Sequence, residues 1–126
     1  MHVPIYTYIK TGNGDTHVLE SIVSIRNSDP RQSIIITSAR FYDGRGKLVK
    51  EYLDKSIKLA PLENRTFIVK KRNSLVGDSA ANFIITWKSE VPVYEPIIDA
   101  VMFGFTEENS FTFKSIGRPL TTHKEQ

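Results

Sequence analysis

The sequence predicts an all-β protein, an antiparallel sandwich of about seven or eight strands in a single domain. Short runs rich in β-branched and aromatic residues recur along the chain, separated by turns that contain Gly, Asn, Asp or Pro. No segment shows helical periodicity of useful length. Residues 33–54 hold two such runs joined by the sequence DGRG, which is typical of a β-hairpin. A small closed barrel is the alternative, because barrels share this pattern.

Two strands are expected before the hairpin. The first spans residues 3–9 and is followed by the turn cluster TGNGD. The second spans residues 17–27, where Leu19, Val23 and Ile25 alternate with polar side chains, so that one face of the strand is buried. The sequence NSDPR then ends the strand, because an Asp-Pro pair favours a turn.

The third strand is predicted at residues 34–42, and strict alternation divides its side chains between two faces. Ile34 and Ile36 face one way, and Ala39 and Phe41 face the other. Because both faces are apolar at the start of the strand, a central place in a sheet is indicated.

The hairpin loop after this strand is Asp43-Gly44-Arg45-Gly46. A type I turn followed by Gly46 at positive φ fits a loop of this length. The returning strand is predicted at residues 47–53.

Further strand-like runs follow at residues 57–62, 65–71, 81–87, 97–105 and 110–116. The first of them contains Pro61, which cannot donate a backbone hydrogen bond, so an edge position is indicated. In the run that begins at Ala81, alternation places Phe83, Ile85 and the single tryptophan, Trp87, on the core face. Residues 1–118 are therefore interpreted as one sandwich domain and residues 119–126 as a polar tail.

Composition excludes several classes of protein. A chain of 126 residues fits one domain, and a hydrophobic fraction of 40% is ordinary for a globular protein. The absence of cysteine excludes disulfides, thiolate zinc sites and a cysteine nucleophile. No apolar run approaches the ~18 residues of a transmembrane helix. The three histidines show no paired spacing, so we expect neither a metal nor another cofactor.

Positive charge is concentrated in the middle of the chain. Residues 40–72 contain ten Lys or Arg and four Asp or Glu, whereas residues 73–126 contain four basic and seven acidic residues. A basic face can attract nucleic acid or anionic lipid. A lysine-rich solvent face that protects strand edges is the simpler interpretation, so nucleic acid is disfavoured as a partner.

Asp99 is the carboxylate that could indicate catalysis, because it lies inside the apolar run of residues 97–102. A buried carboxylate needs a partner, and Arg26 and Arg40 are candidates. An outward position on a partly solvated sheet face is favoured. A hydrolytic enzyme that uses this carboxylate is the third-ranked function, and no nucleophile elbow supports a catalytic triad. We therefore expect that the protein is not an enzyme.

The loop at residues 89–96, SEVPVYEP, is the best candidate for a contact surface. It joins two core strands and carries Tyr94 between two prolines. Prolines reduce the entropy that a loop loses on ordering, and tyrosine is a common interface anchor. An ordinary rigid connection is the alternative.

A carbohydrate- or anion-binding domain is the second-ranked function. Such a site is predicted to use Tyr94 and Glu95 together with the basic residues Lys70, Lys71 and Arg72.

Several segments, taken in order, resemble a family of small bacterial proteins of unassigned function. They are SIRNSDP at 24–30, ITSARFYD at 36–43, GKLVKEYL at 46–53, ANF at 81–83 and PIIDAVM at 96–102. The resemblance covers most of residues 3–118. Residues 61–69 also resemble the start of a strand in bacterial immunoglobulin-like domains. The resemblance brings no catalytic residues to this chain.

Members of that family typically carry an export or lipoprotein signal. The resemblance therefore implies a periplasmic or envelope-associated protein whose export segment has been removed, with a cytoplasmic location as the alternative. The resulting expectation is an immunoglobulin-like β-sandwich that acts as a non-enzymatic envelope module. Its partner would be a protein or a surface polymer, bound through edge strands and loops, and a homo-oligomer is left open.

Overall fold

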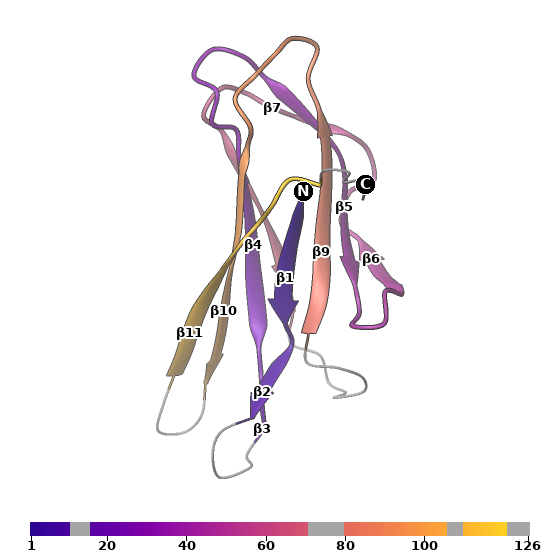
Figure 1. The fold of residues 1–126 in the computed structure, drawn as a ribbon, viewed down its shortest axis with the longest axis vertical. Coiled ribbons are helices and arrows are strands. Elements are labelled where there is room, and N and C mark those ends of the chain that lie inside the picture. Colours follow the sequence, from indigo (N-terminus) through magenta and orange to yellow (C-terminus); the bar gives the residue numbers. More distant parts are fainter. Residues whose placement is uncertain (11–15, 71–79, 106–109, 121–126) are drawn as a thin grey trace, which may run out of the picture.

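The computed structural model describes residues 1–10, 16–70, 80–105 and 110–120 (Figure 1). These residues form strands and connecting loops, and none of them is helical. The strands are β1 (His2–Tyr6), β2 (Tyr8–Lys10), β3 (Thr16–Val18), β4 (Glu20–Arg26), β5 (Ile34–Tyr42), β6 (Leu48–Glu51), β7 (Ile57–Leu59), β8 (Asn64–Val69), β9 (Ala80–Lys88), β10 (Ile97–Phe105) and β11 (Ser110–Ile116).

Two antiparallel sheets pack face to face. The first has the strand order β1-β9-β5-β6, with β7 also paired to β5, and the second has the order β11-β10-β4-β8. The short hairpin β2–β3 connects β1 of the first sheet to β4 of the second. The predicted antiparallel β-sandwich is therefore confirmed, and the described strands do not close into the alternative barrel.

The core lies between the sheets and is built from the alternating apolar residues of the long strands. Val23 and Ile25 on β4 and Phe83 and Ile85 on β9 are all fully buried, as their alternation predicts. Trp87 is half-buried and packs against the edge of this core. Alternation thus located the buried face of both strands.

A β-bulge in the middle of β5 overturns one prediction. Ile36 pairs with Trp87 and Ser38 pairs with Thr86, so that Thr37 is an extra residue on β5. The bulge shifts the phase of alternation, and the side chains before and after it are buried in the same core: Ile34, Ile36, Ala39 and Phe41. The assignment of these residues to opposite faces was wrong, because strict alternation takes no account of an inserted residue.

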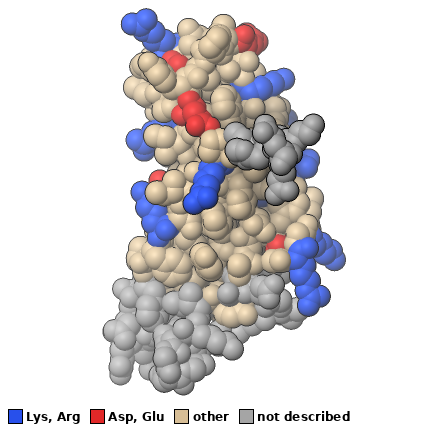
Figure 2. Space-filling model, in the orientation of Figure 1, with Lys and Arg blue, Asp and Glu red and all other residues tan. Residues whose placement is uncertain are grey.

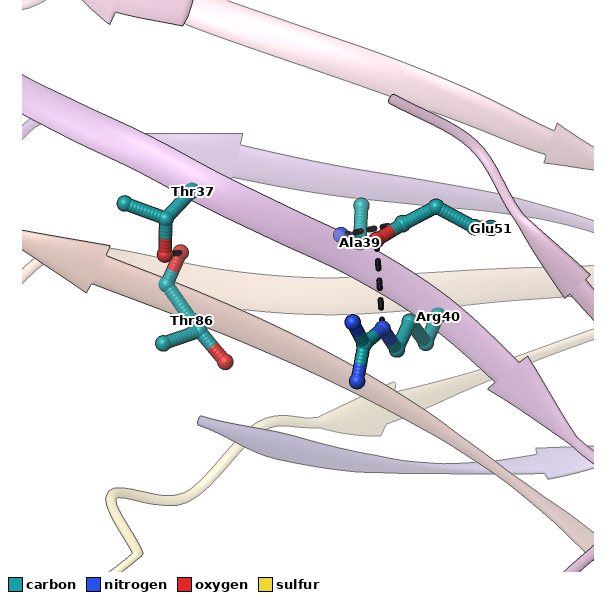
Figure 3. A network of polar contacts seen from close by, with 5 residues as sticks. All are labelled: Thr37, Ala39, Arg40, Glu51 and Thr86. Carbon is teal, nitrogen blue, oxygen red and sulfur yellow. Dashed lines mark hydrogen bonds and ion pairs between the residues drawn. The ribbon is translucent and has the colours of Figure 1, made fainter. Parts of the chain in front are cut away.

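Glu51 fills a gap in the hydrogen bonding beside this bulge (Figure 3). Strands β7 and β6 pair with successive parts of β5, and Ala39 lies between the two pairings. The Ala39 N–H donates to Glu51 Oε2 at 2.9 Å, and Arg40 Nε donates to Glu51 Oε1 at 3.1 Å. The Thr37 hydroxyl donates to the Thr86 carbonyl at 3.1 Å. Side chains thus satisfy polar groups where the regular ladder is interrupted.

The hairpin turn between β5 and β6 has the predicted geometry. The Gly46 N–H donates to the Asp43 carbonyl at 3.0 Å, and Gly46 has a φ of 82°. The Asp43 carboxylate also accepts hydrogen bonds from the backbone N–H groups of Arg45 and Lys47, each at 2.9 Å. The DGRG sequence is therefore occupied by turn formation.

The two long sides of the sandwich differ. On one side His2 and Arg118 exchange backbone hydrogen bonds of 2.8 and 2.7 Å, which join β1 to the segment after β11. On the other side the edge strands β6, β7 and β8 carry the exposed residues Lys50, Lys58 and Arg65. On the face that Figure 2 shows, basic side chains are dispersed over uncharged surface. This placement agrees with the interpretation of the basic stretch as protection of strand edges, which stays a prediction.

Gly117→Ala is expected to destabilise the fold by about 1–3 kcal/mol, because it overpacks the core. The Gly117 N–H donates to the Ile98 carbonyl at 2.7 Å, and a Cβ at this position would overlap Ile98 Cγ2 and lie 2.9 Å from that carbonyl oxygen. Ile98 is fully buried and cannot move aside. Urea unfolding of the two single variants and of the double variant with Ile98→Ala should show strong coupling. Strictly additive free energies would contradict the overlap.

Candidate functional site

Three loop segments meet at one end of the sandwich, where β4, β7 and β9 end (Figure 1). They are residues 27–33, 59–63 and 89–96, and we call this region the loop end. The Asn27 N–H donates to the carbonyl of Glu63 at 2.9 Å, and the Ser28 hydroxyl donates to the carbonyl of Glu95 at 2.6 Å. The first segment is therefore bonded to both of the others.

Asn27 is the centre of this arrangement and is fully buried. Its Nδ2 donates to the carbonyls of Gln32, Leu59 and Ala60 at 2.8, 3.3 and 3.1 Å. Its Oδ1 accepts a hydrogen bond from the Asp29 N–H at 3.0 Å. Because a buried amide must be satisfied, these bonds fix two of the three segments relative to each other.

Asp29 makes the connection to the third segment. Its Oδ1 accepts hydrogen bonds from the N–H groups of Arg31 and Gln32 at 2.8 and 2.9 Å, and its Oδ2 accepts one from the Tyr94 N–H at 3.1 Å. The backbone hydrogen bonds from Arg31 and Gln32 are the main reason that the pKa of Asp29 is held below its usual value.

The stability that Asp29 contributes is expected to depend on pH. Because the pKa of Asp29 is lower in the folded than in the unfolded chain, this contribution is complete above the unfolded value of about 4 and is lost as the pH falls through the folded value. Asp29→Asn should lower stability at pH 7 and flatten the decline in acid. Urea midpoints between pH 7 and 2 measure both effects. If the urea midpoints of wild type and Asp29→Asn fell equally steeply in acid, the assignment of this pH dependence to Asp29 would be wrong.

The loop end exposes large apolar side chains on this rigid frame. Tyr94 is 69% exposed and Leu62 is 61% exposed, and Val91 is exposed as well. Leu62 also has a φ of 62°, which is unfavourable for a residue with a side chain. It follows Pro61 in a turn that is closed by a 3.0 Å hydrogen bond from the Glu63 N–H to the Ala60 carbonyl.

Leu62→Gly is expected to raise stability by about 0.5 kcal/mol. Relief of the left-handed backbone is worth about 1–2 kcal/mol, and the added freedom of glycine in the unfolded chain offsets much of that gain. Leu62→Ala is the matched control, because it removes the side chain and keeps the penalty. Thermal unfolding of both variants should show a gain for glycine alone, and an equal gain for alanine would point to the lost side chain instead.

Besides a hollow lined by Glu95 and Trp87, two hollows lie at or beside the loop end. One, of about 280 Å³, is lined by residues of the first and third segments, including Arg31 and Ser89, and by Lys58 on β7. The second, of about 270 Å³, lies on the outer face of the β4–β8–β10 sheet and contains Arg26 and Asp99.

Asp99 occupies the outward position favoured from the sequence. It is half-buried on β10, opposite Ser24 of β4, and its Oδ2 lies 3.4 Å from Lys114 Nζ. Neither Arg26 nor Arg40 is its ion-pair partner: Arg26 only shares its hollow, and Arg40 pairs with Glu51 on the other sheet. The partner on β11 was not predicted, because sequence alone did not give the strand order.

The structure separates the residues predicted for a carbohydrate or anion site. Tyr94 and Glu95 both lie on the loop end, and Glu95 lines the hollow that also contains Trp87. Lys70 follows the far end of β8, because β8 begins opposite Arg26 and ends opposite Ser21. These residues therefore do not form one site. Lys71 and Arg72 lie outside the described residues.

Sequence reasoning expected the Asn27 side chain to cap loop backbone, as it does, but missed how far its contacts reach and did not single out Arg31 or Lys58. Asn27 and Asp29 were interpreted as residues that end a strand, and their contacts across the loop end come from segments more than 30 positions away. A buried asparagine beside Asp-Pro was the available signal, but burial could not be inferred from so short a motif.

Two further observations concern the described part of the chain. None of its segments is a helix long and apolar enough to cross a membrane. Within the same residues, no group of three or more His, Asp or Glu side chains is placed to hold a metal ion.

Fold and site together define an all-β sandwich domain in which hydrogen bonds join the three segments of the loop end. The chain belongs to the family described as "Protein of unknown function (DUF3124)", whose profile matches residues 1–120. The resemblance to a family without assigned function is thus confirmed. A crystal structure of Thermotoga maritima 1070 is similar, with a TM-score of 0.50 over 93% of this chain and 91% of that chain. Its 12% identity supports the fold alone. A search of curated proteins finds no match.

Proposed function

We propose that this protein is a non-enzymatic binding module of the bacterial cell envelope and that the loop end makes the contact. The observation that carries the proposal is the exposure of Tyr94, Leu62 and Val91 on segments that hydrogen bonds from the buried residues Asn27 and Asp29 hold together. A rigid surface loses little conformational entropy on binding, so its apolar area contributes more to affinity. Tyrosine is also among the residues that most often dominate an interface.

The proposed partner is a protein. Exposed tyrosine and aliphatic side chains beside a satisfied polar network resemble the composition of a protein interface, with an apolar centre and a polar rim. Because loops carried on a sandwich scaffold commonly bind partners, the placement of these side chains supports the loop end over the sheet faces.

Photo-crosslinking in the native host tests this proposal. A photoreactive phenylalanine analogue at Tyr94 is expected to give a discrete adduct with one partner. The same analogue at Thr112, an exposed β11 position on the outer sheet face, is the matched control and should give none. Adding Val91→Asp to the Tyr94 variant should remove the adduct. Equal labelling from both positions would contradict a contact at the loop end.

The envelope location rests on the resemblance of segments such as residues 24–30 and 96–102 to exported proteins. Cell fractionation of the natural gene product, expressed with whatever precedes residue 1, tests it. Recovery in the periplasmic or membrane fraction is expected. Recovery with cytoplasmic enzymes would overturn the location without affecting the contact at Tyr94.

Carbohydrate binding on the outer sheet face is the second candidate, favoured by the hollow around Asp99. Arg26 and Asn64 supply donors, Asp99 supplies acceptors, and the exposed Ile97 offers an apolar surface for a sugar ring. Titration with oligosaccharides released from the host envelope should show affinity that falls at least fivefold in Asp99→Ala. Lys114→Ala, which removes the ion-pair partner alone, should affect it less. Equal affinity of wild type and Asp99→Ala would exclude this site.

A further inference from the structure

We propose that the 280 Å³ hollow at the loop end binds a small oxyanion, a phosphate or carboxylate group, held by Arg31 and Lys58. This inference does not rest on the proposed protein partner. It concerns residues that neither the sequence nor the family description singled out.

The charge of the hollow favours an anion. Among the described residues, Arg31 and Lys58 have no carboxylate within 4 Å, so neither cation is held in an ion pair. Ser33 and Gln32 add polar groups to the lining. Glu90 is the one carboxylate that the described lining contains. Asp29 also attracts Arg31 electrostatically, but no contact within 4 Å joins the two side chains, and the Asp29 oxygens accept three backbone hydrogen bonds.

The register of the first sheet brings a third cation to the same face. Ile35 on β5 pairs with Lys58 on β7 and with Lys88 on β9, so the three side chains stand in one row on the outer face. Directly opposed residues have Cβ atoms about 5 Å apart. Lys88 is exposed and has no ion pair among the described residues. Arg31, Lys58 and Lys88 thus surround a half-buried isoleucine, and this arrangement attracts negative charge.

The segments that line the hollow are held in place before a ligand arrives. Asn27 bonds to the carbonyls of Gln32, within the first segment, and Leu59, next to Lys58. Asp29 bonds to the Tyr94 N–H, in the same loop as Ser89. Because these bonds are made by buried side chains, an anion would not need to order the loops, which favours binding even by a small ligand.

The size of the hollow limits the ligand. At about 280 Å³ it lies just below the usual range of ligand sites, roughly 300–1,000 Å³. It suits a phosphate or carboxylate on a small body. Such a group could come from a free metabolite or from the headgroup of an anionic lipid, and the two sources share the same recognition chemistry.

Titration with inorganic phosphate, followed by amide NMR at low salt, tests the site. Shifts are expected at residues 31–33, 58 and 89–91, with affinity that falls as salt is added. Arg31→Gln and Lys58→Gln should each weaken binding about tenfold, the usual effect of losing a charged hydrogen-bond donor. Lys47→Gln is the matched control. It removes one exposed cation from the hairpin turn at the opposite end and should change affinity by less than about twofold.

Glu90→Gln provides a test of opposite sign. Removing this negative charge from the lining should strengthen phosphate binding, whereas a merely structural effect of loop substitutions would weaken it. Equal weakening by Lys47→Gln and Lys58→Gln would overturn the site, and so would weaker binding by Glu90→Gln.

Two further probes distinguish the source of the anion. Sedimentation with phosphatidylglycerol vesicles that depends on Arg31 and Lys58 assigns the oxyanion to a lipid headgroup, with phosphatidylcholine vesicles as the neutral control. Binding of phosphate or acetate without vesicle binding assigns it to a free small molecule. Binding of no anion by the wild-type protein would overturn the proposal.

Discussion

Replacing Phe83 by alanine is expected to lower the free energy of unfolding by about 3–5 kcal/mol, the usual cost of removing a buried aromatic ring. Phe83 lies on the central strand β9 and is fully buried. Its ring centroid is 5.9 Å from that of Phe67 on the opposite sheet and 5.4 Å from that of Tyr52. The ring therefore fills the space between the sheets where the edge strands β6 and β8 approach. Equilibrium unfolding in urea measures the loss.

Two further variants test whether the cost of Phe83→Ala comes from lost volume and from the central position of the ring. Phe83→Leu keeps much of the volume and should cost about 1–2 kcal/mol. Phe67→Ala also removes a phenyl ring, but from the edge strand β8, where neighbouring side chains can relax. It should therefore cost less than Phe83→Ala. If Phe83→Ala cost less than about 1 kcal/mol, packing among the rings of Tyr52, Phe67 and Phe83 would not be a main contact between the sheets.

The fold could be predicted where the signal is local. Alternation on β4 and β9 identified the buried face of Val23 and Phe83, and turn chemistry identified the hairpin closed by Gly46. Alternation failed at Thr37, because a bulge leaves no mark in the pattern of polar and apolar residues. Strand order could not be predicted either, since it depends on pairings between segments far apart in the chain.

The candidate site, like the fold, could be predicted only where the signal is local in the sequence. The loop that carries Tyr94 was identified from its prolines and its tyrosine, and the structure places it on a rigid end of the sandwich. The proposed combination of Tyr94 with Lys70 failed because β8 carries the chain away from the loop end before Lys70 is reached. Arg31 and Lys58 share a hollow through contacts between three segments, and no local pattern encodes such contacts.

Asn27→Ala is expected to lower the free energy of unfolding by about 3 kcal/mol and to loosen the loop end. The variant removes the side-chain partner of the Leu59 and Ala60 carbonyls and of the Asp29 N–H, and the bonds to Leu59 and Asp29 are buried. Each unsatisfied buried group costs about 1–3 kcal/mol, although water that enters the cavity recovers part of this cost. Urea unfolding measures the total. The Tyr94 N–H donates a hydrogen bond to Asp29, so its rate of hydrogen exchange reports local loosening of the loop end.

Asn27→Asp separates the hydrogen bonds of this side chain from its volume. The aspartate has nearly the same shape, but its ionised form only accepts hydrogen bonds and would face the carbonyl oxygens of Leu59 and Ala60. The folded pKa of the new carboxyl is expected to lie above its unfolded value, so the loss relative to wild type should be greatest at pH 7 and should shrink as the pH falls towards 4. Ser28→Ala, which removes one hydrogen bond to the neighbouring loop, should cost about 1 kcal/mol at every pH. A loss in Asn27→Asp that did not change with pH would show that packing, and not donation from Nδ2, holds residues 27–33 and 59–63 together.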